Sequence, residues 1–391
     1  MRFPEFSGEW EIYPLTDFMS FKNGMNPDAK RFGRGTKFIS VMDILNNQFI
    51  CYDNIRASVE VVDGDIETYG VNYGDILFQR SSETLEDVGQ ANVYLDSKPA
   101  VFGGFVIRGK SKSNYYPMFF RYLLASPTAR KKIIVKGAGA QHFNIGQDGL
   151  SKVCLNIPSI QEQEKIAKLF ECIDTRIATQ NKIIEDLKKL KSAIIEKHYC
   201  KVEKQIACVG DLGEPFSVGN LAKDDLTETG IPCVIYGELF TTYGETISQI
   251  ESHTYKTEGI ILSKKGDLLF PSSTTVDAMS LIAPSVINMD GVILGGDMFG
   301  IHISPNFNAQ YLSYYFNHIA KRQLAKFAKG STIIHLHYAD IEKAKLLLPS
   351  LEEQNRMAKC LVTLDDKIKK ERTFFDLLNS QKAYLLCHMF I

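Results

Sequence analysis

An internal repeat constrains this sequence more than any other feature. The segment 157–163 (IPSIQEQ) returns as 348–354 (LPSLEEQ), a shift of 191 residues. The same shift persists downstream, where it relates Asp174 and Asp365, Leu187 and Leu378, and Lys191 and Lys382, among other pairs. Self-similarity over such a long period indicates that one structural design is built twice in the chain.

The match upstream is looser but covers the same design. GDILF at 74–78 corresponds to GDLLF at 266–270, and the glycine pair at 103–104 corresponds to the pair at 295–296. Each copy therefore consists of a globular module followed by a helix. We divide the chain into a first module at 1–158, a first helix at 159–200, a second module at 201–348 and a second helix at 349–391.

The modules contain both strands and helices. Short apolar and β-branched runs bounded by Gly, Asn, Asp or Pro predict strands at 37–41, 75–78, 105–107, 233–236 and 300–303. Aromatic and leucine residues at helical spacing predict amphipathic helices at 117–124 and 310–322. The sequence therefore predicts an α+β (mixed α/β) fold in each module.

The segment after each Pro-Ser pair has the apolar spacing of a coiled coil. Apolar residues recur at alternating steps of four and three, which is a heptad pattern. Ser159 and Glu162, like Ser350 and Glu353, form a capping-box pattern that starts each helix. The seam residues that we expect to pair the helices or dock a partner are Ile166, Ile173, Ile177, Ile184 and Leu187, and Leu361, Leu364, Ile368, Phe375 and Leu378.

Each helix needs a partner for its single apolar stripe, and the chain supplies one matching helix. We therefore expect the two long helices to pair with each other, which gives the chain an internal pseudo-two-fold. Polar residues interrupt both seams at equivalent steps: Gln180 with Glu371, and Lys191 with Lys382. They are suited to fixing the register or to admitting another protein's side chains, and they are equally compatible with ordinary tolerated seam positions.

Charge and hydropathy exclude several classes of protein. The 391 residues carry a formal net charge of -1, so composition alone gives no reason to suspect nucleic acid. The stretch 205–347 is acidic, with 10 basic and 15 acidic residues. No stretch approaches the roughly 18 apolar residues of a membrane span, and the start of the chain lacks a signal-peptide core, so we expect a cytoplasmic protein.

Two motifs resemble catalytic or metal sites and fail on physical grounds. Residues 104–111 satisfy the phosphate-loop pattern, but their middle is a strand run rather than a flexible loop followed by a helix, and the second copy lacks the lysine. His335 and His337 could form a metal pair, but no third ligand lies near them in the sequence, which favours a structural or DNA-facing role. The sequence therefore predicts no catalytic residues and no metal site.

The whole chain resembles one family. The tandem layout, the opening RFPEF at 2–6 with Trp10, the Gly-Asp strand and the two Pro-Ser-x-x-Glu-Gln helix starts are similar to the DNA-specificity subunit of type I restriction-modification enzymes. The resemblance implies a non-catalytic subunit in which two target-recognition domains each read half of a bipartite, asymmetric site in double-stranded DNA. It also implies that the helices are antiparallel, set the gap between the half-sites and dock two methyltransferase subunits, while restriction and translocase subunits join for cleavage. S-adenosylmethionine, ATP and magnesium would belong to those partners, so that no cofactor is expected in this chain.

Candidate DNA-contacting residues lie on loops that follow or precede rigid strands. Arg80 could bond guanine and Gln141 adenine, although ordinary turn chemistry explains the small residues in these loops equally well. The candidates in the first module are Gln79, Arg80, Ser81, Ser82, Lys136, Gly139, Gln141 and His142. Those in the second are Lys264, Lys265, Ser272, Ser273, Thr274, Lys329, Ser331, Thr332 and His335. The alternative function is a coiled-coil scaffold or adaptor that binds proteins and no DNA.

Overall fold

The computed structural model describes residues 1–390, and the last residue of the predicted second helix, Ile391, lies outside this range. The chain packs into two compact units. The first unit contains residues 1–181 together with the C-terminal stretch from Thr373, and the second contains Lys182–Arg372. Each unit therefore combines one module, the adjoining part of one long helix and the adjoining part of the other. The units cut across the linear division into modules and helices.

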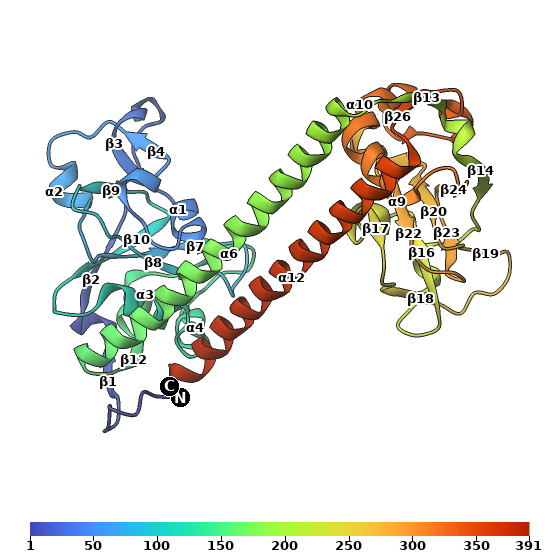
Figure 1. Cartoon of the computed structure of the whole chain (residues 1–391). Coiled ribbons are helices and arrows are strands. Elements are labelled where there is room, and N and C mark those ends of the chain that lie inside the picture. Colours follow the sequence, from blue (N-terminus) through green and yellow to red (C-terminus); the bar gives the residue numbers. More distant parts are fainter. Residues whose placement is uncertain (391) are drawn as a thin grey trace. The chain divides into compact units, whose positions relative to one another are not determined.

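The first unit is built on two four-stranded sheets. One has the order β2-β10-β6-β8 and the other β4-β3-β9-β5, and short ribbons join β1 to β12 and β7 to β11 (Figure 1). The strands are β1 (Glu11–Pro14), β2 (Met19–Asn23), β3 (Phe32–Ile39), β4 (Ala57–Val59), β5 (Gly70–Val71), β6 (Ile76–Gln79), β7 (Ser81–Ser82), β8 (Ala91–Val93), β9 (Ala100–Phe102), β10 (Val106–Ser111), β11 (Phe143–Asn144) and β12 (Cys154–Ile157). The short helices are α1 (Val41–Asn46), α2 (Asp65–Tyr69), α3 (Pro117–Ala125), α4 (Pro127–Ile134) and α5 (Gln147–Ser151).

The second unit repeats this plan with longer sheets. Its five-stranded sheets have the orders β14-β24-β20-β22-β17 and β15-β18-β16-β23-β19, and ribbons join β13 to β26 and β21 to β25. The strands are β13 (Gln205–Cys208), β14 (Gly213–Ser217), β15 (Leu226–Thr227), β16 (Ile231–Ile235), β17 (Thr246–Ile247), β18 (Ser252–Thr254), β19 (Ile261–Leu262), β20 (Asp267–Pro271), β21 (Ser273–Thr274), β22 (Ser285–Ile287), β23 (Ile293–Gly295), β24 (Met298–Ile303), β25 (Ile334–His335) and β26 (Lys345–Leu348). The short helices are α7 (Glu238–Thr241), α8 (Ala278–Leu281), α9 (Ala309–Tyr315), α10 (Lys321–Leu324) and α11 (Tyr338–Ile341), and a π-helical turn at Phe316–Ala320 joins α9 to α10.

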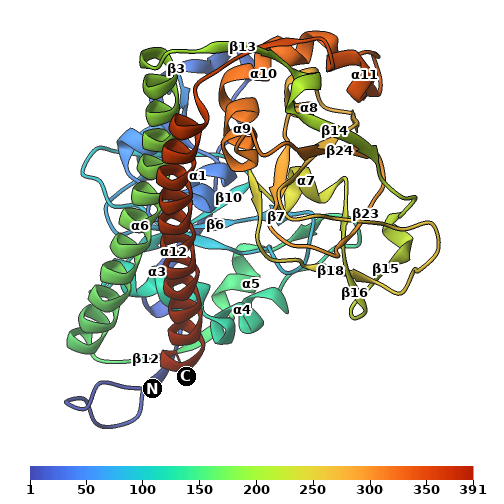
Figure 2. The same cartoon turned by 45° about the vertical axis from the view of Figure 1, so that its right-hand side comes forward.

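The predicted α+β class is confirmed, and the structure has a strand or helix at each predicted segment. The strand predicted at 37–41 ends at Ile39, because Val41 already begins α1, and the helix predicted at 310–322 is divided into α9, the π-helical turn and α10. Helix α9 packs against β20 and β22. Figure 2 shows β14 beside β24, the next strands of the same sheet. The phosphate-loop look-alike at 104–111 runs into strand β10, so its backbone amides are used in sheet pairing with β2 and β6 and cannot converge on a phosphate.

The repeated Gly-Asp pair builds the same turn in both modules. Gly74 and Gly266 have positive φ angles of 88° and 94°, which side chains rarely adopt. The buried carboxylate that follows closes the turn: Asp75 accepts from the backbone of Asn72 at 3.0 Å, and Asp267 accepts from that of Lys264 at 2.8 Å. The motif is thus explained by backbone geometry at the start of β6 and β20.

The long helices are α6 (Ile160–Lys201) and α12 (Leu351–Met389), of 42 and 39 residues. The repeated glutamine explains why both start at the same motif. Gln163 accepts from the backbone of Tyr116 at 3.1 Å and donates to Pro158 O at 3.0 Å. Gln354 makes the equivalent bonds to Asn308, at 3.0 Å, and Pro349, at 2.9 Å. Each buried amide therefore fastens the start of a long helix to the N-cap residue that precedes α3 or α9.

Part of the heptad seam packs on the modules as well as on the other helix. Ile166 and Ile173 belong to the main core of the first module, which also takes in Leu385 and Met389 of α12. Leu361 belongs to the main core of the second module, together with Ile195 of α6. The predicted helix pairing is confirmed within each unit. The first turns of each helix, however, also belong to the hydrophobic core of their own module.

Candidate nucleic-acid interface

The two candidate loops of the first module lie against each other. Strand β7, which follows the Gly-Asp strand, pairs with β11, and the backbone of Ile145 donates to Arg80 O at 2.9 Å. Ala138 and Asn144 exchange two backbone hydrogen bonds of 2.9 Å and close a hairpin between them. Gly139 begins the hairpin tip, where a Cβ atom would lie 2.0 Å from His142 O. We call residues 79–82 and 136–144 the first paired loop.

The second module builds the same arrangement. Strand β21 pairs with β25, the backbone of Leu336 donates to Ser272 O at 2.9 Å, and Lys329 and His335 exchange two backbone hydrogen bonds. Gly330 begins the hairpin tip, and its Cβ would lie 2.0 Å from Ile333 O. We call residues 271–274 and 329–335 the second paired loop. Two loops that the sequence predicted separately in each copy thus form one surface element.

The pairing corrects the correspondence between the copies. The equivalent hydrogen bonds place Lys329 level with Ala138, whereas the order of residues in the sequence suggested Lys136. It follows that Gln141 corresponds to Thr332, and that Asn144, which sequence reasoning missed, corresponds to His335. Alignment of the two hairpin glycines, Gly139 and Gly330, was the signal that could have found it.

Burial separates the predicted contacts into two groups. The exposed candidates on the paired loops are Lys136, Gly139, Gln141, His142, Lys329, Ser331, Thr332 and His335. Arg80, Ser81, Ser82 and Thr274 are half-buried, whereas Gln79, Ser272 and Ser273 are buried. Gln79 is 5% exposed and donates to Ser81 O at 2.9 Å, and therefore braces the loop from inside.

Lys264 and Lys265 lie apart from the second paired loop. Both are exposed in the turn that precedes β20, whereas the loop leaves the other end of that strand. Their backbone amides are held by carboxylates, that of Lys264 by Asp267 and that of Lys265 by Asp290 at 2.8 Å. The structure therefore does not bring these lysines together with the other candidates.

A third segment that sequence reasoning did not select borders each paired loop. The backbone of Arg80 donates to Phe105 O, and that of Ser272 donates to Asp297 O, both at 2.8 Å. The Phe105 side chain is 68% exposed, an unusual state for a large aromatic group, whereas the equivalent position in the second module carries an acid. The two surfaces thus share a backbone and differ in chemistry.

Two side chains of the second paired loop, those of Lys329 and His335, contact neighbouring side chains. Lys329 forms an ion pair with Asp340 of α11, an interaction that lowers the pKa of this carboxyl group. The rings of His335 and His337 stack, with centroids 6.1 Å apart. Within residues 1–390 no three His, Cys, Asp or Glu side chains are grouped as metal ligands, and no helix there is long and apolar enough to cross a membrane.

The helix seam contains the same polar cluster in each unit. In the first, the Asp174 carboxylate lies 2.6 Å from Lys382 Nζ and accepts from the Tyr122 hydroxyl at 2.8 Å. In the second, the Asp365 carboxylate lies 2.7 Å from Lys191 Nζ and accepts from the Tyr314 hydroxyl at 2.5 Å. We call these Tyr–Asp–Lys clusters the seam triads. The lysines that interrupt both heptad patterns are therefore ion-paired with the opposite long helix.

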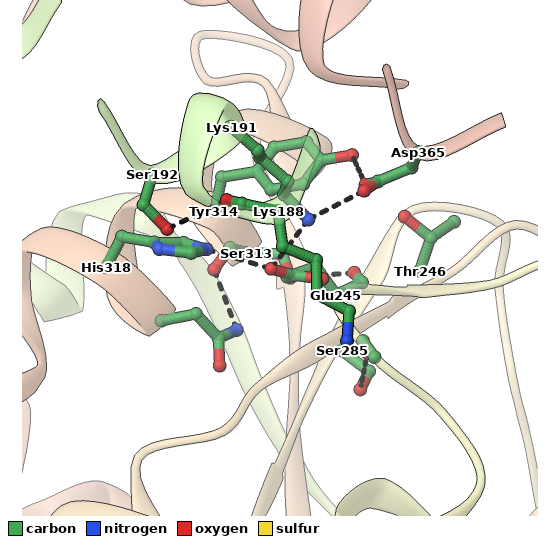
Figure 3. A network of polar contacts seen from close by, with 12 residues as sticks. Lys188, Lys191, Ser192, Glu245, Thr246, Ser285, Ser313, Tyr314, His318 and Asp365 are labelled. Carbon is green, nitrogen blue, oxygen red and sulfur yellow. Dashed lines mark hydrogen bonds and ion pairs between the residues drawn. The ribbon is translucent and has the colours of Figure 1, made fainter. Parts of the chain in front are cut away.

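The second seam triad has an additional carboxylate (Figure 3). Glu245 lies 2.9 Å from Lys191 Nζ and 2.9 Å from His318 Nε2. Burial alone would raise the pKa of Glu245, but the hydrogen bond with His318 and the Lys191 ammonium hold it at about 2. The carboxylate therefore stays ionised at neutral pH.

Known proteins share both the sequence pattern and this fold. The family model of the type I restriction modification DNA specificity domain matches residues 7–189 and again 201–373. The specificity subunit of the MjaVIII type I restriction enzyme of Methanocaldococcus jannaschii is 23% identical, over 95% of this chain and 89% of that protein. A second protein of that organism, provisionally named as the MjaX specificity subunit, is 22% identical over 94% of this chain and 89% of its own length.

Solved structures share the fold of this chain. The crystal structure of the S subunit of a type I restriction-modification system from M. genitalium has a TM-score of 0.59 at 14% identity, and the match covers 100% of this chain and 99% of that one. A chain from a structural study of the assembly and conformational transition of a type I system has a TM-score of 0.60 at 12% identity, covering 98% and 97%. With two family domains that together span most of its length, the chain belongs to the DNA-specificity subunits of type I restriction-modification systems.

Proposed function

We propose that this chain is the sequence-reading subunit of a type I restriction-modification complex, in which each module reads one half of a bipartite, asymmetric site in double-stranded DNA. The observation that carries the proposal is the paired loop, which has the same backbone in both modules but different exposed side chains. A shared scaffold with different surface chemistry suits two different half-sites.

Base contacts are assigned to the exposed tips of the paired loops. Gln141 carries an amide that can bond adenine in the major groove, and Thr332 at the equivalent position presents a hydroxyl and a methyl group. Phosphate contacts are assigned to Lys136 and Lys329, because both side chains are exposed on the paired loops. Gln79, Ser272 and Ser273 are assigned no base contact, because their side chains are buried.

The long helices would dock the methyltransferase subunits through their outward faces. The seam residues Ile166, Ile173, Ile184, Leu361, Ile368 and Leu378 are buried within the chain, and so are not available to a partner. A second apolar set is exposed on the same helices: Ile183 (40%), Leu190 (49%), Phe374 (48%), Leu377 (61%) and Tyr384 (52%). Exposed apolar side chains gathered on a helix are typical of a protein interface.

Catalysis belongs to partner subunits in this proposal. The relatives are named as specificity subunits, and we assign S-adenosylmethionine, ATP and magnesium to methyltransferase and restriction or translocase partners in the cytoplasm. Those partners would also supply much of the phosphate attraction, because 205–347 carries more acidic than basic residues. Binding of the isolated chain to DNA should accordingly be weak.

Methylome sequencing with and without this gene tests the proposal. We expect an adenine mark at one bipartite, asymmetric motif that disappears when the gene is deleted. Replacing 205–347 with the corresponding module of a relative should change one half-site and leave the other unchanged. An unchanged methylome in the presence of an expressed methyltransferase partner would instead favour a protein-binding scaffold.

A further inference from the structure

We propose that the two seam triads are orientation determinants, which make the antiparallel alignment of α6 and α12 the one that gives the buried Asp174 and Lys191 partners of opposite charge. This inference concerns the folding of the chain alone and does not depend on DNA reading. It assigns a positioning role to Asp174, Lys191, Asp365 and Lys382, whose side chains lie at the seam rather than on the exposed helix faces.

The order of the charges along each helix carries the argument. Asp174 precedes Lys191 by seventeen residues on α6, and Asp365 precedes Lys382 by seventeen residues on α12. In an antiparallel pair, the acid of each helix therefore meets the lysine of the other. Both observed ion pairs satisfy one alignment, because the residue numbers of Asp174 with Lys382 and of Lys191 with Asp365 have the same sum.

A parallel alignment would place like charges together. With the two Pro-Ser starts level, Lys191 would lie beside Lys382 and Asp174 beside Asp365. Each acid would then be seventeen residues, about 26 Å, from the lysine of the other helix. An antiparallel slip of one heptad would separate each pair by about 10 Å. Both alternatives leave buried charges without a partner, which is costly at positions as enclosed as Asp174 (8% exposed) and Lys191 (7%).

The tyrosines extend this selection to the modules. Tyr122 and Tyr314 each donate to the acid of the triad, and the lysine lies over the same ring, with Nζ 5.9 Å and 4.8 Å from the ring centroids. The module therefore contacts both members of the ion pair. An alignment that moves the lysine away from the acid also moves the cation away from the tyrosine ring, so that both interactions are lost together.

Exchange of acid and lysine within one helix tests the inference without altering composition. The background is Glu245→Gln, which gives the second unit the kind of residue that the first carries at Gln48. The α12 exchange (Asp365→Lys with Lys382→Asp) and the α6 exchange (Asp174→Lys with Lys191→Asp) each bring like charges together in the antiparallel pair. Each should lower the Tm of the full-length chain by on the order of 5–10 °C.

The chain that carries both exchanges restores opposite charges at each seam position. Its Tm should return to within about 3 °C of the background, with unchanged helical content by circular dichroism. Exchange of the exposed pair Glu185 and Lys188 on α6 is the matched control and should leave the Tm unchanged, because exposed pairs contribute little. A combined chain no more stable than either single exchange, or single exchanges that leave the Tm unchanged, would overturn the inference.

A single-unit cycle covers the case in which the combined chain does not fold. Asp174→Lys and Lys382→Asp are made separately and together in the wild-type chain. Recovery of Tm in the double variant supports charge pairing as the determinant, and its absence refutes it. None of these measurements involves DNA, so that their failure leaves the proposed function standing, while an unchanged methylome leaves this inference standing.

Discussion

The two seam triads have the same residues and different surroundings. Gln48 and Glu245 occupy equivalent positions, because each is held through its backbone carbonyl, the first by Arg121 at 3.3 Å and the second by Ser313 at 2.7 Å. Gln48 donates to Asp174 at 3.3 Å, whereas Glu245 pairs with Lys191 at 2.9 Å. The first triad thus has one carboxylate and the second has two.

This difference distinguishes the contacts that both helix pairs share from the surrounding residues that differ between the modules. The Tyr–Asp–Lys contacts recur in both units, as expected of a feature that serves helix pairing. The residues around them differ in charge, with the half-buried Arg121 near the first triad and Glu245 with His318 at the second. The lysine of the second triad consequently neutralises more charge, and its removal should be more costly than removal of its counterpart.

Removal of the two lysines should produce the largest effect. Lys191→Met removes the ammonium group that lies between Asp365 and Glu245. We expect the free energy of unfolding of the second unit to fall by about 3–5 kcal/mol. Lys382→Met leaves only one carboxylate, Asp174, without its lysine, and the Lys382 side chain is already 29% exposed to water. We therefore expect the free energy of unfolding of the first unit to fall by only about 1–3 kcal/mol. Hydrogen exchange by mass spectrometry measures the two units separately. Equal losses would show that the additional carboxylate of the second triad does not matter.

Acid should destabilise the second unit through Glu245. Its pKa is about 2 in the folded chain against 4.5 ordinarily, so the carboxylate contributes stability that is complete above about pH 5 and is lost as the pH falls towards 2. The contribution is on the order of 3 kcal/mol. Unfolding followed from pH 7 to pH 3 should show a shallower loss of stability in Glu245→Gln than in the wild type. Parallel pH profiles would contradict the ion-pair network drawn around Lys191.

The seam shows how far a single sequence predicts this fold. The heptad spacing and the repeat located both helices, and they marked Lys191 and Lys382 as interruptions of an apolar pattern. The heptad spacing along one helix does not identify which residue of the other helix each seam residue contacts. The antiparallel direction therefore came from family resemblance, and the partners Asp365 and Asp174 came only from the structure.

The candidate interface was predicted in part for the same reason. Both loops of each module were selected because they follow or precede a strand, and the structure joins them as a ribbon. Their contact links residues about sixty positions apart, which local patterns do not encode. The polar side chains of Gln79 and Ser272 were expected to be exposed, and their burial was not encoded in local polarity.

Substitutions at the hairpin tips should affect one half-site each. Gln141→Ala in the assembled methyltransferase complex removes an amide that can make a bidentate contact, and we expect about 1–3 kcal/mol weaker discrimination at one base pair of one half-site. Thr332→Ala at the equivalent position should act on the other half-site alone. Binding to a library of DNA duplexes measures both. Loss of discrimination at both half-sites from either substitution would contradict independent reading by the modules.

The smallest effect is expected at Lys264 and Lys265, which precede β20 and lie apart from the second paired loop. Replacing both with alanine removes only long-range attraction to phosphates, so the affinity of the complex should fall by less than about 1 kcal/mol and the preferred sequence should not change. Thr332→Ala provides the comparison in the same module, because it should change the preferred sequence. The same duplex library, repeated at two salt concentrations, distinguishes the two outcomes. A changed half-site after removal of the two lysines would place the reading surface at the start of β20, and would require the second module to approach DNA by a different edge from the first.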